Sequence, residues 1–265
     1  MQRARRLLKR SHRREDEAFL LEGNRALSDA LAHGASVGEI FVTEELADDP
    51  IVTRAGELGA QIHVVGAPIL KAVSASVTPQ GIVAVAASPL KSLQDIEPSS
   101  GLLLILAAVS DPGNVGTLIR TAAAAGMDAV VLTEGSADPL NPKTARASAA
   151  ALFTTTLVAD VTLGDSLERA RSLGYSVVGA AGEAATDIYS FDLTRATALV
   201  LGNESWGLPE ASRDVLDDEV SIPMPGRMES LNVAVAGSVI VFEALRQRMS
   251  DGSPRVSSGE GGPSE

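Results

Sequence analysis

The chain of 265 residues contains no cysteine, only three histidines and few aromatic residues. Without cysteine it cannot form disulfides, bind metal through thiolates or use a cysteine nucleophile. His12, His33 and His63 all lie in the first quarter of the chain. The C-terminal half must therefore work without histidine or cysteine, which suits a reaction whose cofactor is already activated.

Long apolar runs are also missing. No run approaches the roughly 20 residues that a membrane-spanning helix needs. The basic N-terminus is not followed by an apolar segment, so we expect no signal peptide and predict a cytoplasmic protein. The length allows one or two domains with a large core.

Positive charge is scarce overall, because the formal net charge is −12. That balance argues against a nucleic-acid partner, but its distribution argues for one. Residues 1–14 carry no acid and seven basic residues, which are Arg3, Arg5, Arg6, Lys9, Arg10, Arg13 and Arg14. A solvated tail is one interpretation, and a flexible arm that contacts RNA phosphates is the one we favour.

The first third of the chain alternates short helical and β-rich patterns. Helices are predicted at 23–32, 51–58 and 68–74, and strands at 39–43, 61–65 and 82–86. These elements predict a small α/β domain over residues 15–87. Residues 88–100 have the proline, serine and charge content of a linker.

From residue 101 to 249 the alternation repeats on a larger scale. Strands are predicted at 102–109, 129–133, 175–180, 198–201 and 219–222, and helices at about 115–125, 143–151, 164–173, 208–216 and 232–248. The continuous leucine, isoleucine and valine of the first strand indicate burial on both faces, as in a parallel sheet. The pattern predicts a doubly wound α/β domain. The Gly- and Ser-rich tail at 250–265 is predicted to be disordered.

Three motifs stand out in this second half. They are Asp111-Pro-Gly-Asn-Val-Gly-Thr-Leu-Ile-Arg120, Leu199-Val-Leu-Gly-Asn-Glu-Ser-Trp-Gly-Leu208 and Ile222-Pro-Met-Pro-Gly-Arg-Met-Glu-Ser-Leu-Asn-Val-Ala-Val235. Taken singly, their polar residues have ordinary explanations. Asn114 is placed as a helix N-cap, Ser230 could cap the last helix, and Trp206 is expected to pack rather than stack on a base.

Together the motifs resemble the signatures of the SpoU (TrmH) family of RNA ribose 2'-O-methyltransferases, in the SPOUT superfamily. Phe19-Leu-Leu-Glu-Gly23 and Gln80-Gly-Ile-Val-Ala84 resemble the N-terminal substrate-binding domain of the family, so the likeness spans roughly residues 5 to 248. It implies a ribosomal-protein-like RNA-binding domain, a SPOUT domain with a trefoil knot, and a homodimer. Phe19 and Phe41 are the only aromatic residues of the first domain, so base stacking cannot be its main device.

The resemblance also implies roles for single residues. S-adenosylmethionine is the expected cofactor, and no metal is expected. Arg120 aligns with the catalytic arginine, which either helps to deprotonate the ribose or orients a phosphate and stabilises the alkoxide. The other residues expected in the catalytic site are Asn114, Glu204, which helps to shape it, and Ser230 and Asn232, which are expected near the reacting ribose. The residues expected at the cofactor are Leu201, Gly202, Ile222, Met224 and Leu231.

The predicted function is 2'-O-methylation of structured RNA, with large-subunit (23S) rRNA favoured over tRNA. An rRNA methyltransferase that confers antibiotic resistance would use the same chemistry. Two other classes stay open. A dinucleotide-dependent oxidoreductase would explain the α/β pattern, but Asp111 to Gly116 lacks the GxGxxG spacing. A non-catalytic RNA-binding protein could retain the same motifs.

Overall fold

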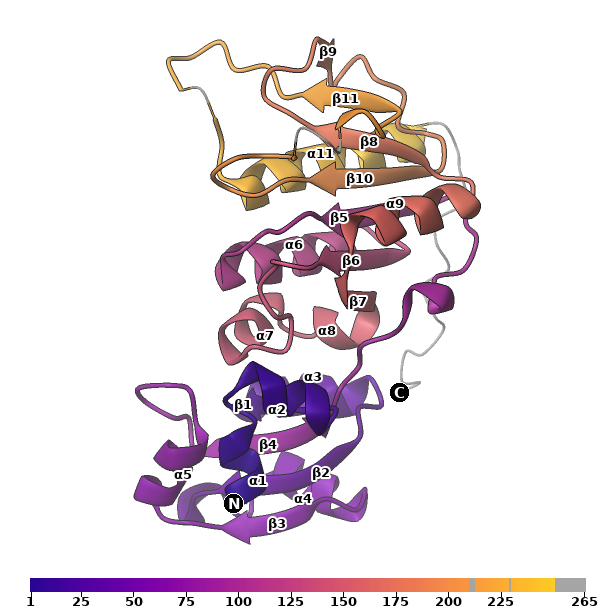
Figure 1. Cartoon of the computed structure of the whole chain (residues 1–265). Coiled ribbons are helices and arrows are strands. Elements are labelled where there is room, and N and C mark those ends of the chain that lie inside the picture. The colour runs from indigo at the N-terminus through magenta and orange to yellow at the C-terminus, as the bar shows by residue number, and fades with distance from the viewer. Residues whose placement is uncertain (210–212, 229, 251–265) are drawn as a thin grey trace.

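The structure is a computed structural model that describes residues 1–209, 213–228 and 230–250. Two α/β units lie one above the other (Figure 1). The first contains a four-stranded sheet and the second a seven-stranded sheet, which confirms the α/β fold class. The tail after residue 250 and part of the helix predicted at 208–216 lie outside the described residues.

The N-terminal unit has the strand order β1-β4-β2-β3, in which only β2 and β3 run parallel. The strand β1 was not predicted, because four of its five residues are buried and it therefore lacks a period of two. The elements are α1 (Gln2–Arg6), α2 (Arg10–Glu15), β1 (Ala18–Glu22), α3 (Asn24–Ala32), β2 (Val37–Val42), η1 (Glu44–Leu46), α4 (Pro50–Glu57), β3 (Gln61–Val64), α5 (Ala67–Val73) and β4 (Ile82–Ala87).

The basic segment is folded, so the prediction of a flexible arm at residues 1–14 is wrong. Its residues form α1 and α2, and Ala4 and Leu7 are fully buried. They pack in one cluster with Leu70 and Val73 of α5. The apolar residues between the arginines therefore belong to the core of the N-terminal unit.

The C-terminal unit is built on the parallel sheet β7-β6-β5-β10-β8-β11-β9. The strand β7 was not predicted, because polar residues and a bulge near Asp160 interrupt its apolar pattern. The elements are η2 (Leu93–Asp95), β5 (Leu102–Leu106), α6 (Pro112–Ala124), β6 (Ala129–Thr133), α7 (Pro142–Ser148), α8 (Ala151–Thr154), β7 (Thr156–Val161), α9 (Leu163–Ser172), β8 (Ser176–Ala180), β9 (Thr186–Asp187), β10 (Thr197–Leu201), β11 (Asp218–Ser221) and α11 (Val233–Ser250).

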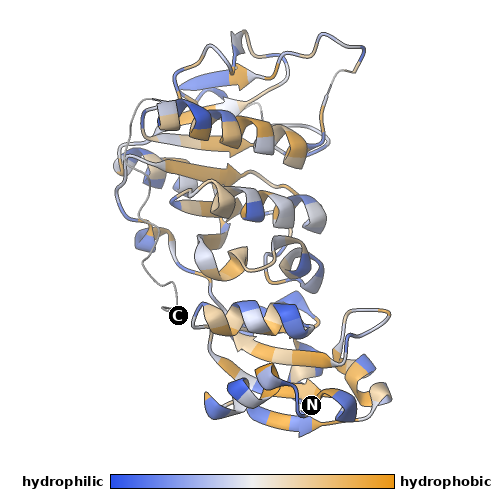
Figure 2. Cartoon of the chain, turned by 180° about the vertical axis from the view of Figure 1, so that it is seen from behind, coloured by the Kyte–Doolittle hydropathy of each residue, from blue (hydrophilic) through white to orange (hydrophobic). Residues whose placement is uncertain are grey.

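Helices cover both faces of this sheet, as the burial of β5 requires. Leu104 and Leu106 join the apolar cluster that includes α6 and α11, whereas Leu103 and Ile105 join the cluster that includes α9. Figure 2 shows α6 and α11 in front of strands that are almost entirely apolar. Of the described helices, none, α11 included, is both long and apolar enough to cross a membrane.

The two units share an apolar contact. The rings of Phe19 on β1 and Phe153 on α8 lie 6.2 Å apart, within one cluster that runs through both units. The connecting segment is also packed, since Leu93 and Ile96 are buried and their carbonyls accept hydrogen bonds from Arg169. The apolar cluster and the packed connection hold the second unit against the first.

Gly237 lies where α11 meets α6 and the sheet. A Cβ atom at this position would lie 2.4 Å from Leu201 Cδ1 and 2.5 Å from Leu118 Cδ2. Both leucines are buried, so Gly237→Ala should lower the free energy of unfolding by about 1–3 kcal/mol. Urea denaturation measures the change.

Gly56 on α4 is the matched control, because a Cβ atom there would make only an ordinary contact, 3.7 Å from Ile62. Alanine is the better helix former, so Gly56→Ala should be neutral or stabilise by up to about 1 kcal/mol. Equal losses in the two variants would contradict the tight crossing at Gly237.

Candidate active site at the meeting of the three motifs

The carboxylate of Glu204 joins the second motif to the first. Its Oε2 accepts hydrogen bonds from the backbone N and the Oγ of Ser110, at 3.1 and 3.2 Å. Its Oε1 accepts from the backbone N of Asp111 at 3.0 Å and from Nδ2 of Asn114 at 3.1 Å. One acidic side chain thus holds the start of α6 against the turn after β10.

The same interaction orients a chain of side-chain amides. A carboxylate can only accept hydrogen bonds, so the NH2 group of Asn114 must face Glu204 and its oxygen must face away. That oxygen accepts from Nδ2 of Asn232 at 3.0 Å. The oxygen of Asn232 in turn accepts from the backbone N of Ala234 at 2.9 Å and of Val235 at 3.3 Å. All three motifs therefore meet in one directional network.

The pKa of Glu204 is set by two opposing effects. Burial raises it, but the hydrogen bonds from the backbone of Asp111, the side chain of Asn114, its own backbone and Ser110 outweigh burial. The result is a pKa lowered from 4.5 to about 2. Glu204 is therefore an anion at neutral pH, and it can orient donors but cannot donate a proton.

The turn that carries Glu204 is stabilised by Asn203, a residue that the sequence analysis did not single out. Asn203 is buried, and its Nδ2 donates to the carbonyl of Ala108 at 2.7 Å. Ala108 has a φ of 56°, in the left-handed region, and its N–H donates to Thr133 Oγ1 at 3.0 Å. The only signal in the sequence was the Gly-Asn dipeptide, which is typical of turns.

Two capping assignments differ from the sequence-based ones. The N-cap of α6 is Asp111, whose side chain accepts from the backbone N of Gly113 and Asn114 at 2.8 and 3.0 Å. The hydrogen bond from the backbone of Asn114 lowers the pKa of Asp111, with help from Lys143 and against the effect of burial. At α11 the capping bonds come from Asn232 and not from Ser230. The side chain of Asn114 is consequently left for Glu204 and Asn232.

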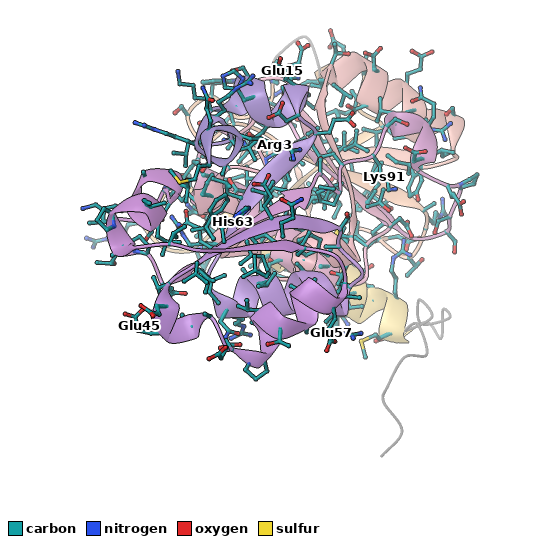
Figure 3. The ribbon with its side chains drawn as sticks, turned by 90° about the horizontal axis from the view of Figure 1, so that it is seen from below. Arg3, Glu15, Glu45, Glu57, His63 and Lys91 are labelled. Atoms are coloured by element: carbon teal, nitrogen blue, oxygen red, sulfur yellow. The ribbon has the colours of Figure 1, made fainter. Side chains whose placement is uncertain are left out.

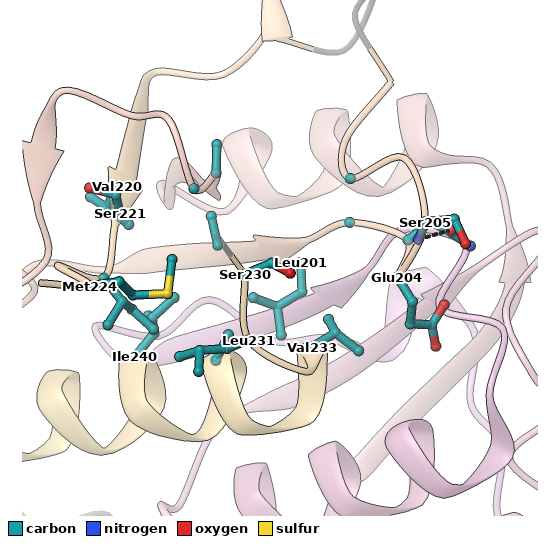
Figure 4. Close-up of a pocket in the computed structure, with 18 residues that line it drawn as sticks. Leu201, Glu204, Ser205, Val220, Ser221, Met224, Ser230, Leu231, Val233 and Ile240 are labelled. Carbon is teal, nitrogen blue, oxygen red and sulfur yellow. Dashed lines mark hydrogen bonds between the residues drawn. The ribbon is translucent and has the colours of Figure 1, made fainter. Parts of the chain in front are cut away.

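A cleft of about 330 Å³ opens beside this network. All five residues predicted to bind the cofactor line it, as do Glu204 and Ser230 (Figure 4). Its walls combine aliphatic side chains with the backbone of three loops that follow strands of the parallel sheet. The five predicted residues that line the cleft are Leu201, Gly202, Ile222, Met224 and Leu231.

Gly202 lies on the cleft, but the protein itself explains its lack of a side chain. A Cβ atom there would lie 2.2 Å from the backbone carbon of Gly207. Asn203 and Gly207 exchange two backbone hydrogen bonds of 2.9 Å across the same turn. The glycine thus permits the turn to close.

Arg120 and Trp206 are both exposed. Arg120 is on α6, six residues after Asn114, and it makes no hydrogen bond or ion pair with the described residues. The side chain of Trp206 is on the turn beside Glu204, and 63 % of its surface is accessible. This exposure does not support the expectation that Trp206 packs against the protein rather than stacking on a base.

The predicted RNA-binding residues fall into two groups. Arg13 is 3 % exposed and donates to Asp138 at 2.8 Å and to the carbonyl of Leu7 at 2.8 Å, which corrects its assignment to RNA. Arg10 and Arg14 both pair with Asp160, Arg6 pairs with Glu15, and Arg3 lies 3.7 Å from Glu39. Arg5 and Lys9 have no acidic partner among the described residues. Figure 3 labels Arg3 and Glu15 on this segment, and His63 of β3 on the same N-terminal unit.

Comparison with known proteins identifies the class to which this architecture belongs. Residues 101–242 match the SpoU rRNA Methylase family, and residues 1–84 match the MRM3-like substrate binding domain. The chain belongs to the SpoU rRNA methylase family.

Individual relatives match along most of the chain. The 23S rRNA (guanosine-2'-O-)-methyltransferase RlmB of Photobacterium profundum is 36 % identical over 220 residues, which cover 79 % of this chain and 89 % of that protein. The 23S rRNA (guanosine(2553)-2'-O)-methyltransferase RlmP of Bacillus subtilis is 34 % identical over 233 residues, covering 88 % and 90 %. The crystal structure of the SpoU methyltransferase AviRb from Streptomyces viridochromogenes, in complex with AdoMet, superposes with a TM-score of 0.86 at 31 % identity, covering 94 % and 97 %.

The cleft fits S-adenosylmethionine by its own chemistry. Its volume is in the range of small-molecule sites, about 300–1,000 Å³. Leu201, Ile222 and Leu231 offer apolar contacts to an adenine ring, and the loop backbones offer peptide groups for its polar edges. Glu204 at one end supplies a negative charge beside the cleft.

Replacing Glu204 tests the network. In Glu204→Gln a single oxygen must replace two, so at least one donor among Ser110, Asp111 and Asn114 loses its acceptor. We expect a loss of about 1–2 kcal/mol in the free energy of unfolding at pH 7. Denaturant titration measures this loss.

The stability that Glu204 contributes should depend on pH. Since folding lowers the pKa of Glu204 from 4.5 to about 2, its stabilisation is complete above about pH 4.5 and is lost as the pH falls toward 2. The difference between wild type and Glu204→Gln should shrink over that window. A difference that is constant from pH 7 to pH 2.5 would show that the carboxylate charge contributes nothing.

Proposed function

We propose that the protein transfers the methyl group of S-adenosylmethionine to a ribose 2'-oxygen of 23S rRNA. The observation that carries this proposal is the hydrogen-bond network in which Asn114, Glu204 and Asn232 meet beside the cleft. Family membership and the names of the relatives support it. Those names favour guanosine as the methylated nucleotide, and we propose that the reaction takes place in the cytoplasm.

The bound cofactor supplies a methyl group on a sulfonium, which is a good leaving group. The task of the protein is then to hold the ribose in line and to ease the loss of one proton. Leu201, Gly202, Ile222, Met224 and Leu231 enclose the cofactor. Ser230 lines the cleft, and Asn114 and Asn232 are hydrogen-bonded beside it. These three residues contact the reacting ribose.

Arg120 acts on the RNA. Its side chain is exposed and unpaired among the described residues, so it is available to a phosphate. A guanidinium keeps its positive charge at neutral pH and has no acceptor atom, so it can only donate hydrogen bonds. Arg120 therefore serves as a two-pronged donor that orients a phosphate and stabilises the forming alkoxide.

The N-terminal unit selects the RNA, in agreement with its match to a substrate-binding domain. Arg5 lies on α1 and Lys9 is the N-cap of α2. The helix α1 packs against α5, which carries the exposed Lys71. We assign these three cations to phosphate contacts, because no described acid neutralises them. The relatives named for 23S rRNA favour this target over tRNA.

Assembly is the remaining part of the proposal. Val235, Phe242 and Met249 are seven residues apart on α11, so they share one face, and they are 51 %, 48 % and 65 % exposed. We propose that this face forms a homodimer and that the loops around the cleft form the trefoil knot implied by the resemblance. An exposed apolar stripe on a helix is typical of such a contact.

Charge on the stripe should separate the subunits. Phe242→Glu places a carboxylate in the proposed contact, so light scattering should change from the dimer mass to a monomer near 27.3 kDa. Glu97→Gln, at an exposed position outside the stripe, is the control and should stay dimeric. A wild-type protein that is monomeric and fully active would refute the dimer.

Arg120 provides the test of the reaction. With S-adenosylmethionine carrying a labelled methyl group and a 23S rRNA transcript, Arg120→Ala should lower turnover by about 100-fold or more. Because the side chain is exposed and makes no hydrogen bond or ion pair with the described residues, the cofactor affinity measured by calorimetry and the free energy of unfolding should stay unchanged. Arg120→Lys should also fail, since one ammonium cannot make a two-pronged contact.

Arg25→Ala is the matched control, because the Arg25 side chain is 90 % exposed and lies far along the chain from the motifs. It should keep its turnover. Cofactor binding without methylation of any RNA by the wild type would favour the non-catalytic alternative. Binding of NAD in place of S-adenosylmethionine would favour the oxidoreductase.

A further inference from the structure

Three arginines of α2 reach across to the C-terminal unit. Arg13 Nε donates to Asp138 Oδ2 at 2.8 Å, and the two side chains are 3 % and 11 % exposed. Arg14 lies 2.7 Å from Asp160 Oδ2, and Arg10 donates to Oδ1 of the same carboxylate. Two acids of one unit thus hold three cations of the other.

Asp160 stands in an unusual backbone conformation. It lies at the bulge where the register of β6 and β7 shifts, and its φ is 62°. Few residues other than glycine adopt this region, and aspartate and asparagine are among those that do so most readily. The bulge directs one carboxylate to both Arg10 and Arg14.

Both acids lie at the carboxyl edge of the parallel sheet, which is also the edge of the cleft. Asp138 follows β6, and its loop is tied to the loop before α6, because Ala137 N donates to the carbonyl of Val109 at 2.9 Å. The next residue, Ser110, is bound by Glu204. A second bond, from Glu134 N to the carbonyl of Val161 at 2.8 Å, ties the end of β7 to the same loop. The domain contact is therefore one loop away from the network.

We propose that Asp138 and Asp160 are positioning residues that fix the N-terminal unit, through Arg13, Arg10 and Arg14, in the orientation that brings bound RNA to the cleft. The inference rests on the proposed function, since it assigns a role within RNA methylation. It also divides the basic segment, because Arg10, Arg13 and Arg14 act on protein while Arg5 and Lys9 act on RNA.

Neutralising Asp160 separates this proposal from direct phosphate binding by Arg10 and Arg14. If the two arginines bind phosphate, removing their acid frees them, so RNA should bind more tightly and with a steeper salt dependence. If they orient the domain, removing the acid loosens it, so RNA should bind more weakly at an unchanged salt slope. The two roles therefore predict opposite changes in the affinity for RNA.

The variant is Asp160→Asn, because asparagine keeps the size of the side chain and tolerates a positive φ. With a 23S rRNA transcript as probe, we expect kcat/KM for RNA to fall by roughly three- to tenfold, as small misplacements of a substrate do. The affinity for S-adenosylmethionine should not change. Tighter RNA binding, or an unchanged kcat/KM, would overturn the proposal.

Two control variants remove one charge each. Glu168→Gln removes an acid that is exposed on α9 and has no partner among the described residues, so kcat/KM should stay as in the wild type. Arg5→Gln removes a proposed phosphate contact, so it should weaken binding and lower the salt slope by somewhat under one unit. To support a positioning role, Asp160→Asn must lower kcat/KM, unlike Glu168→Gln, and must leave the salt slope unchanged, unlike Arg5→Gln.

Hydrogen exchange tests the contact without RNA. In Asp160→Asn the amides of α2 should exchange about tenfold faster or more, while those of β10 in the buried sheet stay protected. Unchanged exchange in α2 would show that Asp160 does not hold this helix. That result would overturn the positioning role whether or not the wild type methylates RNA. Faster exchange with unchanged kcat/KM would show that the ion pairs stabilise the domain contact but do not position the RNA, which would also overturn the proposal.

A double-mutant cycle completes the test. Arg10→Gln with Arg14→Gln should cause the same loss of kcat/KM as Asp160→Asn, and combining all three changes should add nothing, because both sets break one contact. Fully additive losses would show that the arginines and Asp160 act independently, which contradicts the proposal. This cycle uses the full chain throughout.

Discussion

The acceptor-only carboxylate of Glu204 is the constraint on which the site depends. It binds four donors from the segment 110–114, and it thereby fixes which way each amide in the chain from Asn114 to Asn232 points. The turn 202–207, the left-handed backbone of Ala108 and the cap of α11 all meet at this network. The parallel sheet brings the segments together, since each follows the carboxyl end of a strand.

This arrangement suits a site without histidine or cysteine. Because the pKa of Glu204 is lowered to about 2, the carboxylate is an anion at neutral pH, and it orients groups without exchanging protons. In the reaction that we propose, stabilisation of charge is left to Arg120, whose guanidinium is exposed and positively charged. The proposed mechanism thus separates the groups that position the reactants from the group that stabilises the developing charge.

The sequence predicts the parts of this architecture that local patterns specify. Leu102 to Leu106 is apolar throughout, so its burial on both faces follows from composition. The strand β7 escapes prediction because polar residues and the bulge at Asp160 break its apolar pattern, and the register of a bulge is set by the neighbouring strand β6. The prediction of a flexible basic arm failed for a related reason. Asp138, which pairs with the buried Arg13, lies 125 residues further along the chain, so no local pattern could reveal the pair. In the site, motifs identify Asn114, Glu204 and Asn232, but their hydrogen bonds arise only from the fold.

The exposure of Trp206 has a practical consequence. It is the single tryptophan of the chain, and it is two residues from Glu204 on the turn that borders the cleft. Its indole meets solvent, whereas Tyr175, one of only two tyrosines, is buried. Selective excitation therefore reports on one position of the molecule. The native protein carries its own fluorescent reporter on the turn that borders the cleft, and changes in that turn can be followed in real time without a label.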